Sequence, residues 1–244
     1  MNTLSLRRIA GLLLVIVPVL FTVCFTLLQM QFEYPDILRQ PTADVLTKFQ
    51  AGGPNLIAVW YVLTITAVLF IPVVVFTHRA LAADQGSPLL WLATTFGVVA
   101  GLAQALGFLR WPFLVPHLAQ AYLAPGASEA QRAAAALVFE AFHRYAGMAI
   151  GEHLGYLATS VWTVVIALLL VRRPGISRWL GVSGAVFAVG IAAGLLEPAG
   201  VEVAGTINAT SYLAWAAWLV AVGVWLLTQR AESPLLARSA PALA

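Results

Sequence analysis

Six apolar windows, each about twenty residues long, constrain the fold of this chain more than any other feature of its sequence. They cover residues 9–30, 56–77, 88–109, 149–171, 178–197 and 207–229. A helix of about 20 apolar residues spans the hydrocarbon core of a bilayer. Helices satisfy every backbone polar group within the segment, which lipid requires. The sequence therefore predicts an all-α, polytopic membrane bundle of six transmembrane helices, forming one domain over residues 1–244.

The composition agrees with lipid as the surrounding solvent. Hydrophobic residues make up 61% of the 244 positions and charged residues only 9%, whereas about 25% of an ordinary soluble domain is charged. A soluble fold of this length could not bury so much apolar surface. The formal net charge is +3, but no run of Lys or Arg exceeds two residues, so no nucleic-acid partner is expected. Cys24 is the single cysteine, which excludes an intrachain disulfide.

The distribution of cations predicts the orientation of the bundle. With the N-terminus in the cytoplasm, eight Arg residues fall on the inner side and five cations on the outer side. Cytoplasmic segments of membrane proteins carry an excess of Lys and Arg. Both termini are therefore expected in the cytoplasm, and residues 231–244 are expected to form a flexible cytoplasmic tail.

The two longest connections, residues 31–55 and 110–148, are predicted outer loops with short interfacial helices. Thr42 is a predicted N-cap, and the helix that follows it is expected to stop at Gly52–Gly53. Ser128 begins a predicted capping box, with a glutamine three residues later.

Tryptophans near the ends of the windows are expected in two interfacial belts. In the predicted orientation, Trp60 and Trp111 lie at the outer interface, and Trp91, Trp179 and Trp225 at the inner one.

Glycine rows predict where the helices pack most closely. Small residues at four-residue spacing let helix backbones approach one another in lipid. Three windows carry such rows, which consist of Gly97 and Gly101, then Gly147, Gly151 and Gly155, and then Gly190 and Gly194. We expect spans three, four and five to form the tight centre of the bundle.

Titratable residues are expected at the outer ends of the spans rather than in their middle. At about 1.5 Å per residue, the distance from Arg172 back to Glu152 is roughly 30 Å, which equals one hydrocarbon thickness. Glu152 and His153 should therefore lie at the outer boundary. Gln104 is the strongest polar group within the inner part of any span. Because ion-coupled transporters and pumps generally need ionisable groups near the bilayer centre, that class is not favoured.

Helical phase, at about 100° per residue, predicts which boundary residues face the bundle. Glu197 lies on the side of its glycine row, and Glu152 flanks its own row, whereas His153 points almost opposite. Arg110 points away from Gly101 and is expected to extend towards the lipid headgroups.

Glu140 and His143 match one half of the Glu-x-x-His pattern of bundle di-iron sites. The chain has no second copy, so a metal site is not expected. Glu140, His143 and Arg144 instead predict the solvated face of an amphipathic surface helix, with a Glu140–Arg144 pair. Leu137 and Tyr145 should then lie on the opposite, packed face.

The outer residues form one candidate binding cluster. Its members are Glu152, His153, Glu197, Glu202, His143, Glu140, His117, Arg110 and Gln104. Four of them could also serve an enzyme or a metalloprotein: Glu152, His153, Glu197 and His143. No cofactor is expected, and the alternative is haem held by two of the three outer histidines.

Four segments of the chain resemble a known family. They read "LRRIAGLLLVIVPVLF", "FEYPDILRQPTADVLTKFQAGGPNL", "FHRYAGMAIGEHLGYL" and "ISRWLGVSG". They resemble the bacterial membrane proteins grouped as domain of unknown function 4386, over a range from Leu6 to about Gln229. The resemblance implies a polytopic bacterial inner-membrane protein, and it implies no activity, substrate or catalytic residue.

The sequence thus favours a non-catalytic membrane protein whose outer rim binds a small amphiphile, a lipid or a membrane protein partner. One alternative is a membrane-embedded hydrolase, or a haem- or metal-binding protein, that uses the outer Glu and His residues. The other is a structural subunit of a membrane complex.

Overall fold

The computed structural model describes residues 3–82, 87–172 and 178–228. Within these ranges the secondary structure is entirely helical, and six helices are long and apolar enough to cross a membrane. The prediction of an all-α bundle with six transmembrane helices is confirmed, and the chain is a multi-pass membrane protein. The predicted tail at 231–244 lies outside the described residues.

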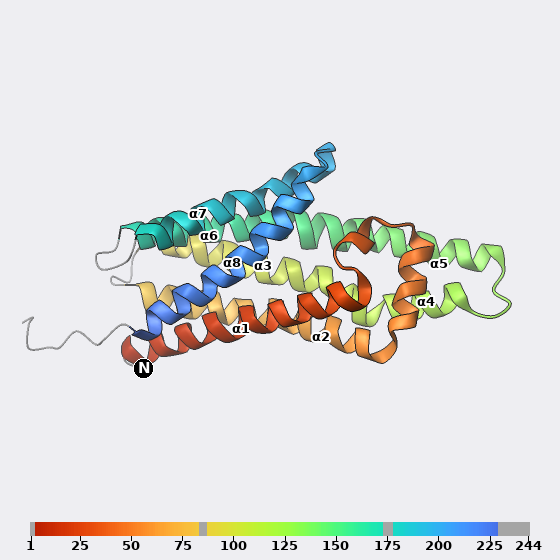
Figure 1. Ribbon diagram of the computed structural model, residues 1–244, viewed down its shortest axis with the longest axis horizontal. Helices are drawn as coiled ribbons and strands as arrows, with labels where there is room; N and C mark the ends of the chain where they lie inside the picture. The colour runs from red at the N-terminus through yellow and green to blue at the C-terminus, as the bar shows by residue number, and fades with distance from the viewer. Residues whose placement is uncertain (1–2, 83–86, 173–177, 229–244) are drawn as a thin grey trace, which may run out of the picture.

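The helices run roughly along one common direction, and the described chain ends lie together at one end of the bundle (Figure 1). We call the opposite end, towards which η1, α4 and η3 lie, the loop end. In chain order the elements are α1 (Thr3–Phe32), η1 (Asp36–Arg39), α2 (Thr42–Leu81), α3 (Pro88–Phe113), α4 (Val115–Leu123), α5 (Glu129–Phe142), η2 (His143–Leu154), α6 (Gly155–Val171), α7 (Arg178–Ala193), η3 (Gly194–Ala199) and α8 (Val203–Thr228).

The segment at 110–148 is mostly helix rather than loop. α4 continues the direction of α3, and α5 runs back beside it into η2 and α6, so that the bundle is extended beyond its core (Figure 1). The chain reverses at Gly126, which has a positive φ of 79°, a conformation that glycine adopts without steric cost. The predicted capping box at Ser128 and Gln131 is present and starts α5.

The segment at 31–55 also contains a helix of its own. α2 begins at Thr42 and changes direction at Gly53, whose φ of 57° and ψ of −154° interrupt the helix. The stop expected at Gly52–Gly53 is therefore present as a kink. The N-cap prediction for Thr42 is wrong: Pro41 occupies the cap position, and the Thr42 hydroxyl donates a hydrogen bond to Glu140 instead (3.0 Å).

An aromatic core fills the loop end. Trp60 and Trp111 stack with ring centroids 4.7 Å apart, and Phe32 and Phe49 pack against the Trp111 ring. Both tryptophans are fully buried at the loop end, so their rings face the protein interior rather than lipid. The segments at 31–55 and 110–148 fold over these rings and enclose them within the protein.

Helix α3 closely approaches η2 and α6. A Cβ built on Gly107 would lie 2.7 Å from the Cα of Gly151, and Gly155 faces Gln104 of α3. Gly97 likewise makes room for Trp162 of α6. Small residues thus bring the third and fourth spans together, as expected.

Two of the predicted glycines face other helices. Gly101 packs against the backbone of Ala67 in α2, and Gly190 against Ser211 in α8. Gly194 faces Asn208 of α8 as well as a tyrosine at the start of α6. The prediction of one centre made of spans three, four and five is therefore wrong in part, because Gly101 packs against α2 and Gly190 against α8.

α1 and α8 meet near the chain ends and then diverge. Gly11 and Gly223 are in backbone contact, because a Cβ on Gly223 would lie 2.8 Å from the carbonyl oxygen of Gly11. Towards the loop end α8 leans away from α1 (Figure 1). This divergence leaves space between the two helices at the loop end.

Candidate functional site

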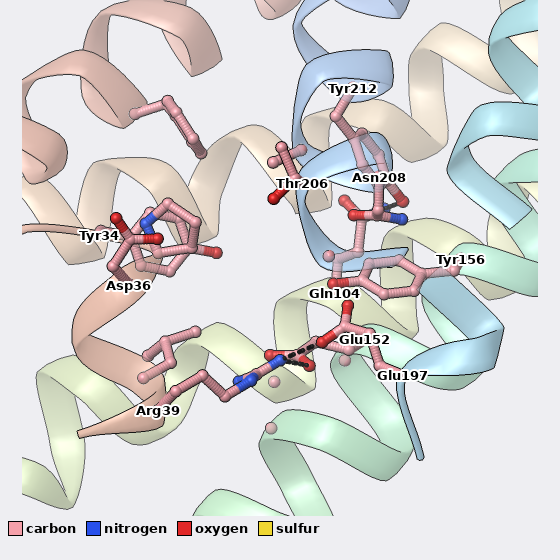
Figure 2. A pocket seen from close by; sticks show the side chains of 18 of the residues that line it. Tyr34, Asp36, Arg39, Gln104, Glu152, Tyr156, Glu197, Thr206, Asn208 and Tyr212 are labelled. Carbon is pink, nitrogen blue, oxygen red and sulfur yellow. Dashed lines mark hydrogen bonds and ion pairs between the residues drawn. The ribbon is translucent and has the colours of Figure 1, made fainter. Parts of the chain in front are cut away.

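A cavity of about 860 Å³ lies at the loop end, enclosed by α1, η1, α3, η2, η3 and α8. Figure 2 shows Tyr34 and Asp36 on one side and Thr206 and Asn208 on the other. Small-molecule sites in proteins usually measure about 300–1,000 Å³. The volume is therefore sufficient for a small ligand or for the head of a larger one.

Arg39 closes one end of this cavity. Its Nη2 atom donates to Glu152 (3.0 Å) and to Glu197 (2.7 Å), as the dashed lines in Figure 2 mark. The three residues come from η1, η2 and η3, so one guanidinium joins segments that are far apart in the sequence. Burial alone would lower the pKa of Arg39, but attraction to Glu152 and hydrogen bonds to both carboxylates outweigh it. The pKa of Arg39 lies above its usual value, and the side chain stays charged.

The loop that carries Arg39 is held down by buried groups. Ile37 and Leu38 of η1 are buried, and the Nε2 atom of His143 lies 3.0 Å from the carbonyl oxygen of Leu38. Lys48 forms an ion pair with Glu33 at the start of the same loop. These contacts fix the backbone beneath Arg39, which positions its guanidinium over the cavity.

His143 is not on a solvated face, contrary to expectation. It is 8% exposed and stacks on Phe139, whereas Leu137 and Tyr145 are 69% and 70% exposed. Polar side chains of membrane helices face the protein interior, because lipid disfavours them. The predicted solvated face therefore holds for Glu140 and Arg144, which are exposed, but is wrong for His143.

Glu140 also has a different partner from the one expected. It accepts the hydrogen bond from Thr42, and no Glu140–Arg144 ion pair is present within the described ranges. Glu140, His143 and Arg144 line a second cavity of about 300 Å³ on the other side of η1.

Arg110 is buried in the wall of the larger cavity rather than extended to the headgroups. It is 7% exposed, and its Nη1 atom donates to the carbonyl oxygen of Gly107. Gly147 makes room for it: a Cβ there would lie 2.6 Å from the Arg110 Cζ atom. Its Cζ also lies 5.0 Å from the centre of the Trp111 ring. Gly147 of η2 thus lets the guanidinium turn inward. The helical phase of Arg110 relative to Gly101 did not indicate this, because it describes α3 alone.

A hydrogen-bond cluster forms the deeper polar wall. Gln104 donates to the hydroxyls of Thr159 (3.1 Å) and Tyr212 (3.3 Å), so α3, α6 and α8 meet through polar groups. Asn208 donates to the carbonyl oxygen of Ile191 (2.7 Å). At the opposite wall, burial and then the charge of Glu152 raise the pKa of Tyr34, which keeps its hydroxyl neutral.

Five of the nine candidate residues line the larger cavity, and four do not. Those that line it are Gln104, Arg110, Glu152, Glu197 and Glu202. Glu152 and Glu197 face inward and His153 is exposed, as helical phase predicted. His117 is exposed as well.

Sequence reasoning missed several residues that line the cavity. They are Tyr34, Asp36, Arg39, Tyr156, Asn208 and Tyr212. Asn208 and Tyr212 share one face of α8 at a four-residue spacing, and this polar pair within an apolar window is the signal that could have indicated them. The loop residues carry no comparable signal, because their positions depend on long-range contacts.

The histidines are not brought together. None of His117, His143 and His153 lines the larger cavity. Across residues 3–82, 87–172 and 178–228, no three His, Cys, Asp or Glu side chains are grouped to hold a metal ion. A haem held by two of these histidines would therefore have to bind outside this cavity.

Comparison with known proteins gives one match. No curated protein and no solved structure matches the chain. The model of the family described as Domain of unknown function (DUF4386) matches residues 9–229, which confirms the resemblance seen in the sequence. Since that range covers almost the whole chain, the protein belongs to the family described as Domain of unknown function (DUF4386).

Proposed function

We propose that this protein binds a small amphiphile, such as a lipid, in the cavity at its loop end, and that it does so without catalysing a reaction. The observation that supports this function best is the combination of polar and apolar groups around one space. The polar groups include Arg39, Glu152 and Glu197, and the apolar ones include Phe21 and Leu213.

The charged and the apolar groups of the lining are separated along the bundle. The charged groups lie at the loop end, where Arg39 holds two carboxylates. Phe21 and Phe25 of α1 and Leu213 of α8 line the part that lies between the diverging helices. An amphiphile would place its head against the charged groups and its chain between α1 and α8, towards the surrounding lipid. Such an arrangement satisfies both parts of the ligand at once.

Binding is favoured over hydrolysis because Arg39 is hydrogen-bonded to both candidate catalytic acids. Glu152 and Glu197 each accept a hydrogen bond from its guanidinium through one carboxylate oxygen, so each acid already has a partner in the cavity. The remaining candidates, His143 and His153, do not line the cavity. A structural subunit is the other alternative, and co-purification of a partner would favour it.

The lipid-binding cavity would open to the outer side of a bacterial inner membrane, and both chain termini would lie in the cytoplasm. In the sequence, the segments predicted to be cytoplasmic carry eight Arg residues against five cations in the predicted outer segments, which supports this orientation. Two single cysteines test it in a Cys24→Ser background. A membrane-impermeant maleimide should label Arg132→Cys in intact cells, and Arg172→Cys only after permeabilisation. The reverse pattern would contradict the orientation.

Ligand binding can be tested by filling the space between α1 and α8. Ala209 lines the cavity, and Ala209→Trp should reduce the lipid retained by the purified protein about tenfold, measured by native mass spectrometry. Val189→Trp is the matched control, because Val189 is 69% exposed on α7. Equal retention by both variants, or no retained lipid in the unmodified protein, would contradict the proposed function.

A further inference from the structure

Arg110 is a buried cation without a carboxylate partner. The ion pairs among the described residues join Arg39 to Glu152 and Glu197, and Lys48 to Glu33. Arg110 takes part in none of them, and its Nε atom is buried with no hydrogen-bond acceptor. A buried charge is unfavourable unless it is paired and hydrogen-bonded. Because Arg110 lines the cavity, a ligand in that cavity could supply the missing partner.

Arg110 lines the cavity among three glycines and is only 7% exposed. Gly107, Gly147 and Gly151 line the cavity around it, so no side chains from these positions cover it. Gly147 lies directly against the guanidinium. The planar fork of an arginine matches the oxygen atoms of a phosphate, which accept two parallel hydrogen bonds. Arg110 therefore suits an anionic phosphate group.

Two exposed acids of the cavity lining carry the opposite charge. Asp36 and Glu202 both line the cavity and are both exposed, and neither is in an ion pair within the described part of the chain. With Glu152 and Glu197 included, the lining carries four carboxylates against two guanidiniums, a formal charge of −2. A ligand that is only anionic would be repelled on entry, whereas one that also carries a cation would not.

We infer that the amphiphile has a zwitterionic head, with its phosphate at Arg110 and an amine or quaternary ammonium at Asp36 and Glu202. This inference rests on the proposed function. Because Arg110 is buried and the two acids are exposed, we place the anion nearer the apolar chain and the cation nearer the exposed part of the lining. Zwitterionic phospholipids and single-chain phosphocholines have this order.

A panel of amphiphiles with one chain length tests the charge order. The full-length protein, purified in the neutral detergent dodecyl maltoside, is titrated with dodecylphosphocholine, dodecyl phosphate, dodecyltrimethylammonium and a dodecyl sulfobetaine. The sulfobetaine carries the same two charges in the reverse order. We expect dodecylphosphocholine to bind at least about tenfold more tightly than the other three, measured as dissociation constants. Equal binding of the two zwitterions would overturn the inference.

Two sets of variants assign the charges to residues. Arg110→Gln should weaken binding of dodecylphosphocholine and dodecyl phosphate about tenfold while leaving dodecyltrimethylammonium unaffected. The double variant Asp36→Asn/Glu202→Gln should remove the advantage of dodecylphosphocholine over dodecyl phosphate. These two acids are exposed, so the double variant keeps the inference testable if Arg110→Gln does not fold. Unchanged ratios in the double variant would overturn the assignment.

The outcomes separate this inference from the proposed function. If all four amphiphiles bind with similar dissociation constants and Ala209→Trp abolishes their binding, the cavity binds amphiphiles but does not select a zwitterion. If none of the four binds, both the proposed function and the inference are wrong.

Discussion

The Nη2 atom of Arg39 and a carboxylate oxygen of Glu197 lie 2.7 Å apart, although 158 positions separate the two residues in the sequence. The same Nη2 atom reaches Glu152, so the loop after α1 is tied to the ends of two later helices. No other described cation contacts two of the cavity's acids. Arg39 therefore couples the loop over the cavity to the helices beneath it.

Arg39→Ala should loosen the loop more than it destabilises the protein. The Arg39 side chain is 43% exposed, and exposed ion pairs contribute only about 0–1 kcal/mol. Backbone amides of residues 33–41 should exchange faster with deuterium, with little change in the melting temperature. Arg144→Ala is the control, because Arg144 is an exposed arginine in no ion pair of the described chain. Unchanged amide hydrogen exchange at residues 33–41 would show that the buried Ile37 and Leu38 hold the loop without a contribution from Arg39.

His143 should be important for stability, whereas His153 should not. His143→Ala removes the side chain that hydrogen-bonds the Leu38 carbonyl and stacks on Phe139. Losing such a buried bond costs about 1–3 kcal/mol. His153→Ala alters an exposed position and should change stability by less than about 0.5 kcal/mol. Denaturant titration in detergent would measure the free energy of unfolding of both variants. Equal losses of stability would favour the solvated face that the sequence predicted for His143.

The fold was predictable because its main determinant is local. Each apolar window forms a helix from its own residues, and its length matches a bilayer. Helical phase also placed Glu152 and Glu197 on the inner side correctly, because each residue lies within a helix or directly after one. These inferences needed only the residues of one segment.

The cavity was less predictable, since it depends on two non-local effects. Arg110 turns inward because Gly147, on another helix, leaves space for it. Arg39 lies in a loop whose path is fixed by distant carboxylates. Single-segment reasoning contains none of this information.

The contact between Gly107 and Gly151 should not tolerate a methyl group. A Cβ on Gly107 would lie 2.7 Å from the Gly151 Cα, which is backbone and cannot rotate away. Overpacking of this kind costs about 1–3 kcal/mol, so Gly107→Ala should lower the melting temperature in detergent. Gly155→Ala is the matched control, since its Cβ would meet the flexible Gln104 side chain at 3.3 Å. Similar melting temperatures for the two variants would contradict the close approach of α3 and η2.

Tyr34 should make the protein sensitive to alkaline pH. Burial, and then the negative charge of Glu152, raise the pKa of its hydroxyl in the folded state. The unfolded chain therefore releases this proton first, at about pH 10. The contribution of neutral Tyr34 to stability is complete below that pH and falls as the pH rises further, because the unfolded state then binds fewer protons. Thermal unfolding followed from about pH 8 to pH 11 should show the loss, and Tyr34→Phe should reduce its slope. Tyr145→Phe is the control, because Tyr145 is 70% exposed, and it should leave the slope of stability against pH unchanged. If Tyr34→Phe also leaves this slope unchanged, the alkaline sensitivity comes from another group.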